Sequence, residues 1–106
     1  MRSEVLRGHL DLLLLATVAA EPAHGYRIVE DLRARSGGAF DLSEGTVYPA
    51  LYRLERRGLL SSRWASVAGR RRRVYSLTRK GRRALAEQRR DWAAFAAAVR
   101  GVVGAT

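Results

Sequence analysis

The pattern of hydrophobic and polar positions is most informative between residues 43 and 58, SEGTVYPALYRLERRG. Val47, Ala50, Leu51 and Leu54 follow the i, i+3, i+4, i+7 spacing that is typical of the buried stripe of an amphipathic helix. The opposite face carries tyrosines, arginines and a hydroxyl, which suit a groove lined with phosphates better than bare solvent. The candidate contact positions of this segment are Ser43, Glu44, Gly45, Thr46, Tyr48, Pro49, Tyr52, Arg53 and Arg56.

Both ends of this helix are marked in the sequence. Ser43 can cap the first amides, and Gly58 supplies a left-handed stop. Pro49 lacks an amide and presses on the carbonyl of Gly45, so we expect the helix to distort there or to begin later than Ser43. Gly45, which has no side chain on the outer face, lets the backbone approach another surface closely.

Residues 3–20 predict a helix that is apolar on all sides, capped by Ser3. Its large apolar side chains are Leu6, Leu10, Leu12, Leu13, Leu14 and Leu15. Such a helix must be covered all round. In so small a domain this predicts a partner chain, and therefore a homodimer.

A signal peptide is the competing interpretation of the same segment. Glu4, Asp11 and the absence of an A-x-A site argue against it, and the apolar run is too short to span a bilayer. We therefore expect a cytoplasmic protein without a membrane partner.

Residues 24–38, HGYRIVEDLRARSGG, predict a second helix with Tyr26, Val29 and Leu32 on its buried side. His24 has no second histidine or carboxylate at metal-ligand spacing, so a capping role at the start of this helix is favoured over a ligand or general base. A helix, a turn and a second, capped basic helix form the outline of a DNA-reading unit.

Two β-suited runs, LLSSRWASV and RRRVYSLT, flank AGR and predict a hairpin. Leu60, Trp64, Val74 and Leu77 are expected to face the helices. The tip carries Arg70, Arg71, Arg72 and Arg73. These arginines either form a solvated loop or, following a recognition helix, a wing that reaches flanking DNA.

Thr78 should cap a last helix that runs to about Arg100, with residues 101–106 fraying. Its narrow apolar stripe at near-heptad spacing is typical of a helix that packs on another helix. The stripe consists of Leu85, Trp92, Phe95 and Val99. The chain thus divides into residues 1–78, a winged helix-turn-helix, and residues 79–106, a dimerisation helix.

Composition restricts the function further. The 106 residues suffice for one domain, and the lack of cysteine excludes disulfides and thiol chemistry. The net charge of +10 is concentrated, because residues 53–90 hold fourteen of the twenty basic groups and two of the ten acidic ones. A general preference for arginine explains why the basic residues are arginines. It does not explain why they cluster within residues 53–90, and this clustering favours a polyanion partner.

With these elements in order, the chain resembles the PadR family of winged-helix transcriptional regulators. The resemblance covers nearly the whole length. It rests on the leucine run followed by HGY at residues 24–26, on SEGTVYPALYRLERRGLL from Ser43, and on GRRRRVYSLTRKG from Gly69. The middle block is the most specific of the three.

The resemblance implies a mainly α fold with a small β-hairpin. It also implies a homodimeric repressor that binds double-stranded DNA. It places the third helix in the major groove, the wing on flanking DNA, and the first and last helices in the dimer. Arg71 stands where the family usually has proline, which leaves the exact path of the wing open. Trp92, a large planar ring near the expected two-fold axis, is either a packing residue or the lining of a pocket for a planar aromatic effector.

The sequence is compatible with two other functions. One is a winged helix that binds RNA or a partner protein without controlling a gene, since the fold serves such partners too. The other is an enzyme, which has little support because no glycine-rich phosphate loop or recognisable nucleophile motif occurs. No cofactor is expected.

Overall fold

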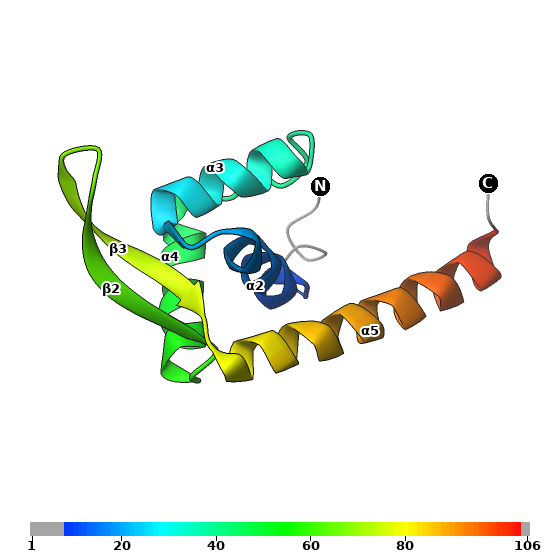
Figure 1. Ribbon diagram of the computed structural model, residues 1–106. Helices are drawn as coiled ribbons and strands as arrows, with labels where there is room; N and C mark the ends of the chain where they lie inside the picture. The colour runs from blue at the N-terminus through cyan, green and yellow to red at the C-terminus, as the bar shows by residue number, and fades with distance from the viewer. Residues whose placement is uncertain (1–7, 105–106) are drawn as a thin grey trace.

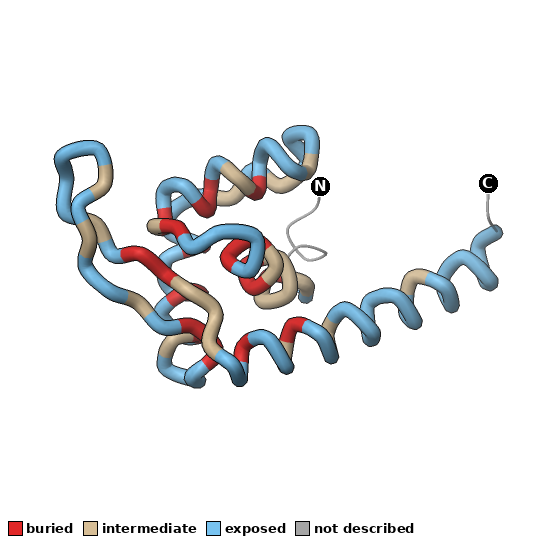
Figure 2. The backbone as a smooth tube through the Cα atoms, in the orientation of Figure 1, coloured by how far each residue is buried: buried red, intermediate tan, exposed pale blue. Residues whose placement is uncertain are grey.

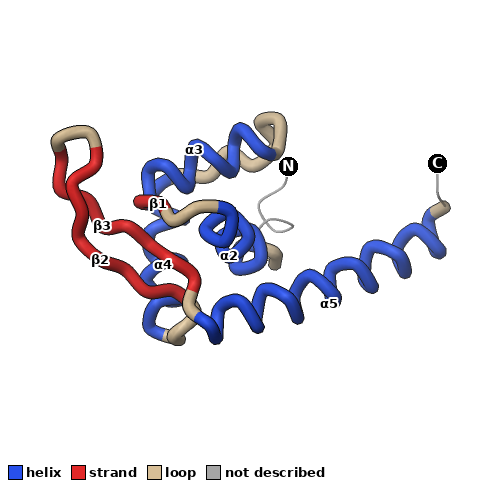
Figure 3. Tube along the Cα trace, viewed as in Figure 1, coloured by secondary structure: helices blue, strands red, loops and turns tan. Residues whose placement is uncertain are grey.

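A computed structural model describes residues 8–104, which form four helices and a three-stranded antiparallel sheet (Figures 1 and 3). The elements are α2 (Leu10–Ala20), β1 (Ala23–His24), α3 (Gly25–Arg35), α4 (Glu44–Arg56), β2 (Leu60–Val67), β3 (Arg70–Leu77) and α5 (Arg79–Val103). The predicted winged helix-turn-helix followed by a C-terminal helix is confirmed. The short strand β1 was not predicted from the sequence.

Helix α2 lies at the centre of the body, in contact with α3, α4, β3 and α5 (Figure 1). Leu14 and Leu15 are fully buried, and Leu10 is 9% exposed. The expectation that a second chain must cover this helix on all sides is therefore wrong for Leu10 and Leu14, because the chain's own elements cover them. Ser3 and Leu6, which belong to the same prediction, lie outside the described residues.

Helix α3 buries Ile28, Val29 and Leu32 against this core. The expectation that Tyr26 lies on the buried side is wrong, because its side chain is 47% exposed. The buried positions begin at Gly25 and repeat at i+3, i+4 and i+7, so position 26 is turned about 100° away from them.

Ser43 is the N-cap of helix α4, which begins at Glu44, so the alternative that Pro49 delays the start of the helix is wrong. Pro49 lies within the helix on the exposed side. At the other end Gly58 adopts φ 78°, and its amide donates to the Glu55 carbonyl at 2.9 Å. The Leu59 amide donates to the Leu54 carbonyl at 3.0 Å. This is the predicted glycine stop in the form of a Schellman motif.

The strands β2 and β3 form a long hairpin that extends away from the helices (Figure 1). Its two-residue turn consists of Ala68 and Gly69, which have φ values of 52° and 78°. Strand β3 continues without interruption through Arg71, which pairs opposite Ser66. At the base, β1 adds a third strand by pairing Ala23 with Tyr75.

Helix α5 starts at the predicted cap, where the Gly81 amide donates to the Thr78 hydroxyl at 2.9 Å. Its first turns pack on the body and bury Leu85. The helix then extends away from the body with most of its surface exposed (Figure 2). It remains helical to Val103, so the expected fraying is wrong for residues 101–103.

Candidate nucleic-acid interface

The outer face of α4 is presented to solvent as the hydrophobic pattern predicts. Val47, Ala50, Leu51 and Leu54 are at most 1% exposed, so the inner face is locked in the core. The exposed residues are Ser43, Glu44, Gly45, Thr46, Tyr48, Pro49, Tyr52, Arg53 and Arg56. A rigid helix with hydroxyl, phenol and guanidinium groups on its free side can enter a groove and donate hydrogen bonds there.

The start of α4 is ordered by its cap. The Thr46 amide donates to the Ser43 hydroxyl oxygen at 3.2 Å, and the two hydroxyl oxygens lie 3.1 Å apart. Glu44 occupies the first turn, where the helix dipole favours an anion. These contacts fix the end of the helix that a helix-turn-helix protein directs toward base edges.

Tyr48 joins the two helices of the helix-turn-helix. A Cβ atom placed on Gly25 would lie 2.5 Å from the Tyr48 ring atoms Cε1 and Cζ, so the ring rests directly on the α3 backbone. Tyr48 is nevertheless 39% exposed, whereas Tyr52 is 60% exposed and has the Arg56 guanidinium 5.8 Å from its ring centroid. A side chain at position 25 would displace this ring from α3, so Gly25 is a site residue, one that the sequence pattern did not reveal.

Arg53 is less free than the other outer residues. Its Nη2 donates to Asp11 Oδ1 on α2 at 2.6 Å, and Arg57 Nη1 contacts the second oxygen of the same carboxylate at 3.3 Å. Asp11 is 28% exposed at its side chain. The pairing spans 42 residues of sequence and was not predicted.

The hairpin divides its four arginines between two faces. Arg71 and Arg73 share a face with Trp64, each with its guanidinium carbon 5.4 Å from a tryptophan ring centroid. The expectation that Trp64 faces the helices is wrong: it is 53% exposed, because the twisted hairpin carries it past the helical body. Leu60, nearer the base on the same face, is buried in the core as expected, and Leu77 packs against that core. Val74 is buried as well, but on the opposite face of the hairpin.

The wing is tied to the end of α4 by a short polar chain. Arg73 Nε donates to the Ser62 hydroxyl at 2.7 Å, and this hydroxyl donates to Glu55 Oε2 at 2.5 Å. Arg73 Nη2 also lies 3.7 Å from the same carboxylate oxygen. The hairpin and the candidate recognition helix therefore keep a defined relative position.

His24 has the capping role that the sequence favoured. Its Nδ1 accepts the Arg27 amide at 3.3 Å at the start of α3. Burial, with the nearby charges of Arg72 and Arg27, lowers the pKa of His24 from 6.5. The neutral ring, which alone can accept at Nδ1, is thereby favoured.

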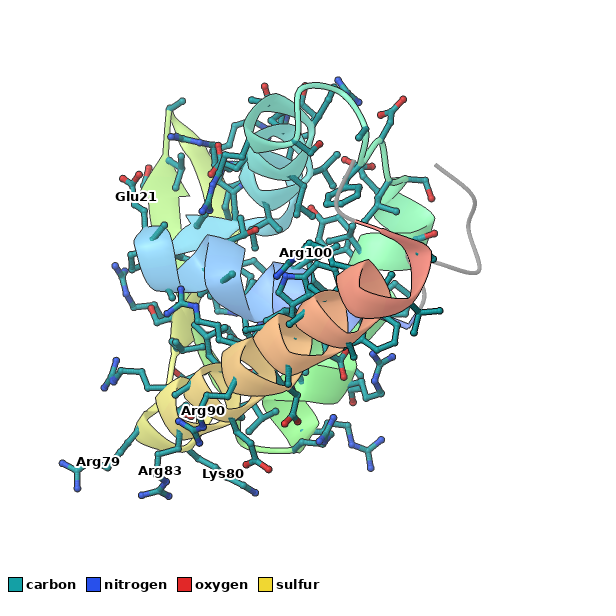
Figure 4. All side chains as sticks on the ribbon, turned by 90° about the vertical axis from the view of Figure 1, so that its right-hand side faces the viewer. Glu21, Arg79, Lys80, Arg83, Arg90 and Arg100 are labelled. Atoms are coloured by element: carbon teal, nitrogen blue, oxygen red, sulfur yellow. The ribbon has the colours of Figure 1, made fainter. Side chains whose placement is uncertain are left out.

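The N-terminal half of α5 carries further positive charge. Arg79, Lys80, Arg83 and Arg90 project from this helix (Figure 4). Lys80 Nζ also donates to the Arg57 carbonyl at 3.0 Å and so satisfies the end of α4. The basic excess of residues 53–90 therefore extends over α4, the hairpin and α5.

An open cavity of about 420 Å³ lies between α2 and α5. His9, Trp92 and Phe95 line it, with the His9 and Trp92 ring centroids 5.2 Å apart in an edge-on arrangement. The Asp11–Arg53 pair forms part of its wall. Trp92 is 47% exposed and Phe95 57% exposed, so neither is a core residue of this chain.

Among residues 8–104 no three His, Asp or Glu side chains gather closely enough to hold a metal ion. None of the described helices is long and apolar enough to cross a membrane.

Comparison with known proteins identifies relatives over most of the chain. The model of the family described as Transcriptional regulator PadR-like family matches residues 14–87. The transcriptional regulator Rv3488 of Mycobacterium tuberculosis is 44% identical over 87 residues, covering 82% of this chain and 78% of that protein.

Solved structures agree with this match. A PadR family transcription regulator from Clostridium difficile is similar with a TM-score of 0.81 at 30% identity, covering 91% of this chain and 99% of that one. A padr family transcriptional regulator from Eggerthella lenta has a TM-score of 0.82 at 33% identity, covering 97% and 88% respectively.

Proposed function

Because this chain belongs to the PadR-like family of transcriptional regulators, we propose that it is a homodimeric repressor that binds a palindromic operator and leaves it when a small effector binds. In this proposal residues 1–78 bind DNA and residues 79–106 dimerise. The observation that carries it is the outer face of α4, polar and aromatic along a helix whose other face is fully buried.

We place α4 in the major groove. Thr46, Tyr52 and Arg56 are exposed and can reach base edges, while Arg53 can do so once it leaves Asp11. The wing supplies the second contact. Arg70, Arg71, Arg72 and Arg73 follow one another along β3, and a run of guanidinium groups binds phosphates or a narrow minor groove irrespective of base sequence.

The dimer contact is proposed on the outer part of α5. Phe95, Val99, Val102 and Val103 are 57%, 39%, 87% and 72% exposed, an apolar surface that one chain leaves in water. A two-fold axis would cover it with the same surface of a second copy. Leu13 on α2, partly exposed, can join this interface, whereas Leu10, Leu14 and Leu85 support it from within the core.

The cavity beside Trp92 is the proposed effector site. The half-exposed indole, flanked by His9 and Phe95, can stack on a planar aromatic ring. Trp92→Ala should therefore reduce effector response more than stability, because the ring is not buried within the chain. We would measure operator release and fluorescence quenching by planar aromatic compounds in the wild type and the variant. Loss of the dimer in the variant, with no quenching in the wild type, would reduce Trp92 to a packing residue.

DNA binding itself is tested by selecting bound duplexes from a random pool and by gel shifts at increasing salt. If the dimer neutralises about 6–10 phosphates, affinity should drop by roughly 10³ to 10⁵ between about 50 and 200 mM salt. The selected sites should contain two half-sites about one helical turn apart. A flat salt response, or preference for single-stranded RNA, would refute the proposal.

Variants of helix and wing should fail differently. Arg53→Gln or Tyr52→Ala should cost about 1–3 kcal/mol of discrimination between operator and random duplex. Arg71→Gln or Arg72→Gln should weaken binding to both duplexes about equally. Equal losses on both duplexes for all four variants would show that α4 only positions the protein.

A further inference from the structure

Asp11 connects the core helix α2 to the basic end of α4. Each of its carboxylate oxygens contacts a different guanidinium, with Arg53 at 2.6 Å and Arg57 at 3.3 Å. Both arginine side chains are about half exposed, whereas Asp11 is 28% exposed. One partly shielded carboxylate thus holds two of the arginines that would otherwise be free for phosphates.

Arg56 provides the contrast on the same turn of α4. It makes no ion pair with a carboxylate in the part of the chain that the structure describes, and its guanidinium lies near the Tyr52 ring. Two kinds of arginine are therefore present at this end of the helix: a free one, and two held by a carboxylate on another element.

We propose that Asp11 is a positioning residue for specificity, which withholds Arg53 and Arg57 from random DNA and yields Arg53 only to the operator. The inference rests on the DNA-binding function proposed above. It assigns to an acidic residue outside the helix-turn-helix a share in the discrimination between sequences.

The physical basis is a competition for the same guanidinium. A phosphate of random DNA offers Arg53 only a negative charge, and Asp11 already provides one. If Arg53 moved to that phosphate, the partly shielded carboxylate would lose its 2.6 Å contact and keep only Arg57 at 3.3 Å. A guanine in the operator offers the fork two acceptors, O6 and N7, in a fixed plane. The transfer of Arg53 from Asp11 to DNA is then favourable only where the DNA sequence supplies that pair of acceptors.

The test compares Asp11→Asn with Asp91→Asn. Asp91 lines the same cavity but forms no ion pair within residues 8–104, so both changes raise the formal net charge by one from +10 and only the first releases arginines. Binding to a random duplex and to the selected operator is measured across a salt series, with circular dichroism as a check of folding.

Asp11→Asn should raise random-duplex affinity by roughly tenfold more than Asp91→Asn, and should steepen the salt slope by about 0.9 for each released arginine that reaches a phosphate. Operator affinity should rise less, so that discrimination falls. Asp11→Glu, which keeps the charge, should restore wild-type discrimination. In an Arg53→Gln, Arg57→Gln background the effect of Asp11→Asn should disappear.

Equal effects of Asp11→Asn and Asp91→Asn would overturn the inference and leave the proposed function intact, because the wild type would still bind duplex DNA in a salt-dependent way. A wild type that does not bind duplex DNA would overturn both. If Asp11→Asn does not fold, Arg56→Gln must weaken random-duplex binding more than Arg53→Gln does, and equal losses would refute the withholding of Arg53.

Discussion

Replacing Gly81 by alanine tests the packing of α5 on the end of the helix-turn-helix. A Cβ atom at this position would lie 2.0 Å from the Leu59 carbonyl oxygen and 2.9 Å from Leu77 Cδ1. The carbonyl cannot move freely, because it accepts the Thr78 amide at 3.1 Å and the Thr78 hydroxyl donates to the adjacent Gly58 carbonyl at 2.6 Å. A methyl group therefore forces the backbone of α5 away from its cap.

Overpacking of this kind costs roughly 1–3 kcal/mol, and a clash with backbone belongs at the upper end. Removing glycine from a helix returns about 0.5–1 kcal/mol. We therefore expect Gly81→Ala to lower the free energy of unfolding by about 2 kcal/mol, equivalent to a fall in Tm of roughly 8–16 °C for a domain of this size.

Gly101→Ala is the matched control on the same helix. Its Cβ would meet nothing within 4 Å, so only the helix-propensity gain of up to about 1 kcal/mol remains. Urea unfolding followed by circular dichroism, at one fixed protein concentration, measures both variants. The reasoning fails if Gly81→Ala is as stable as the wild type while Gly101→Ala shows its gain.

Three further predictions concern caps and turns. Because the pKa of His24 is lowered below 6.5, its neutral ring stabilises the fold above that pH, and this contribution should be lost as pH falls through the folded-state pKa. The urea midpoint of the wild type should therefore drop between about pH 7.5 and pH 5, and this drop should be smaller in His24→Asn. An equal drop in both proteins would contradict the prediction. Ala68→Asn should raise stability by about 1 kcal/mol, because Ala68 occupies φ 52° in a two-residue turn where Asn-Gly is preferred; a loss in the Tm would show that the turn is constrained otherwise. Thr78→Ala should lower the free energy of unfolding by about 1 kcal/mol, because the cap of α5 is lost, whereas Thr78→Ser should retain most of the wild-type stability.

Most features set by local sequence were predicted correctly, with the exposed Tyr26 as the exception. The buried face of α4 follows from four apolar residues at helical spacing, and its ends follow from Ser43 and Gly58. The caps at His24 and Thr78 also act within three residues of their acceptors or donors. In each case the partners are neighbours along the chain, so spacing alone determines the contact.

Features set by distant contacts were missed or misjudged. Strand β1 is two residues long, too short for any periodicity, and exists because Tyr75 and its neighbour offer a free edge. Trp64 is apolar, yet it lies on the part of the hairpin that extends beyond the core. Arginine side chains therefore pack near its ring in place of core residues. The all-apolar helix α2 predicted coverage by a second chain, whereas the chain's own elements bury Leu14 and Leu15 and leave Leu12 and Leu13 partly exposed.

The candidate interface, too, depends on both local and distant contacts. The side chains that face solvent on α4 are presented by local helix geometry, which any amphipathic sequence of this pattern would give. Their position relative to the rest of the interface depends on contacts between distant residues. Tyr48 rests on Gly25 of α3, Arg53 pairs with Asp11 of α2, and Arg73 of the wing connects through Ser62 to the end of α4. A regulator that distinguishes one DNA sequence from another requires these distant contacts, because several groups must meet base edges at fixed relative positions. Substitutions that spare the outer face but alter these three contacts should therefore act on discrimination between sequences rather than on the presence of the helix.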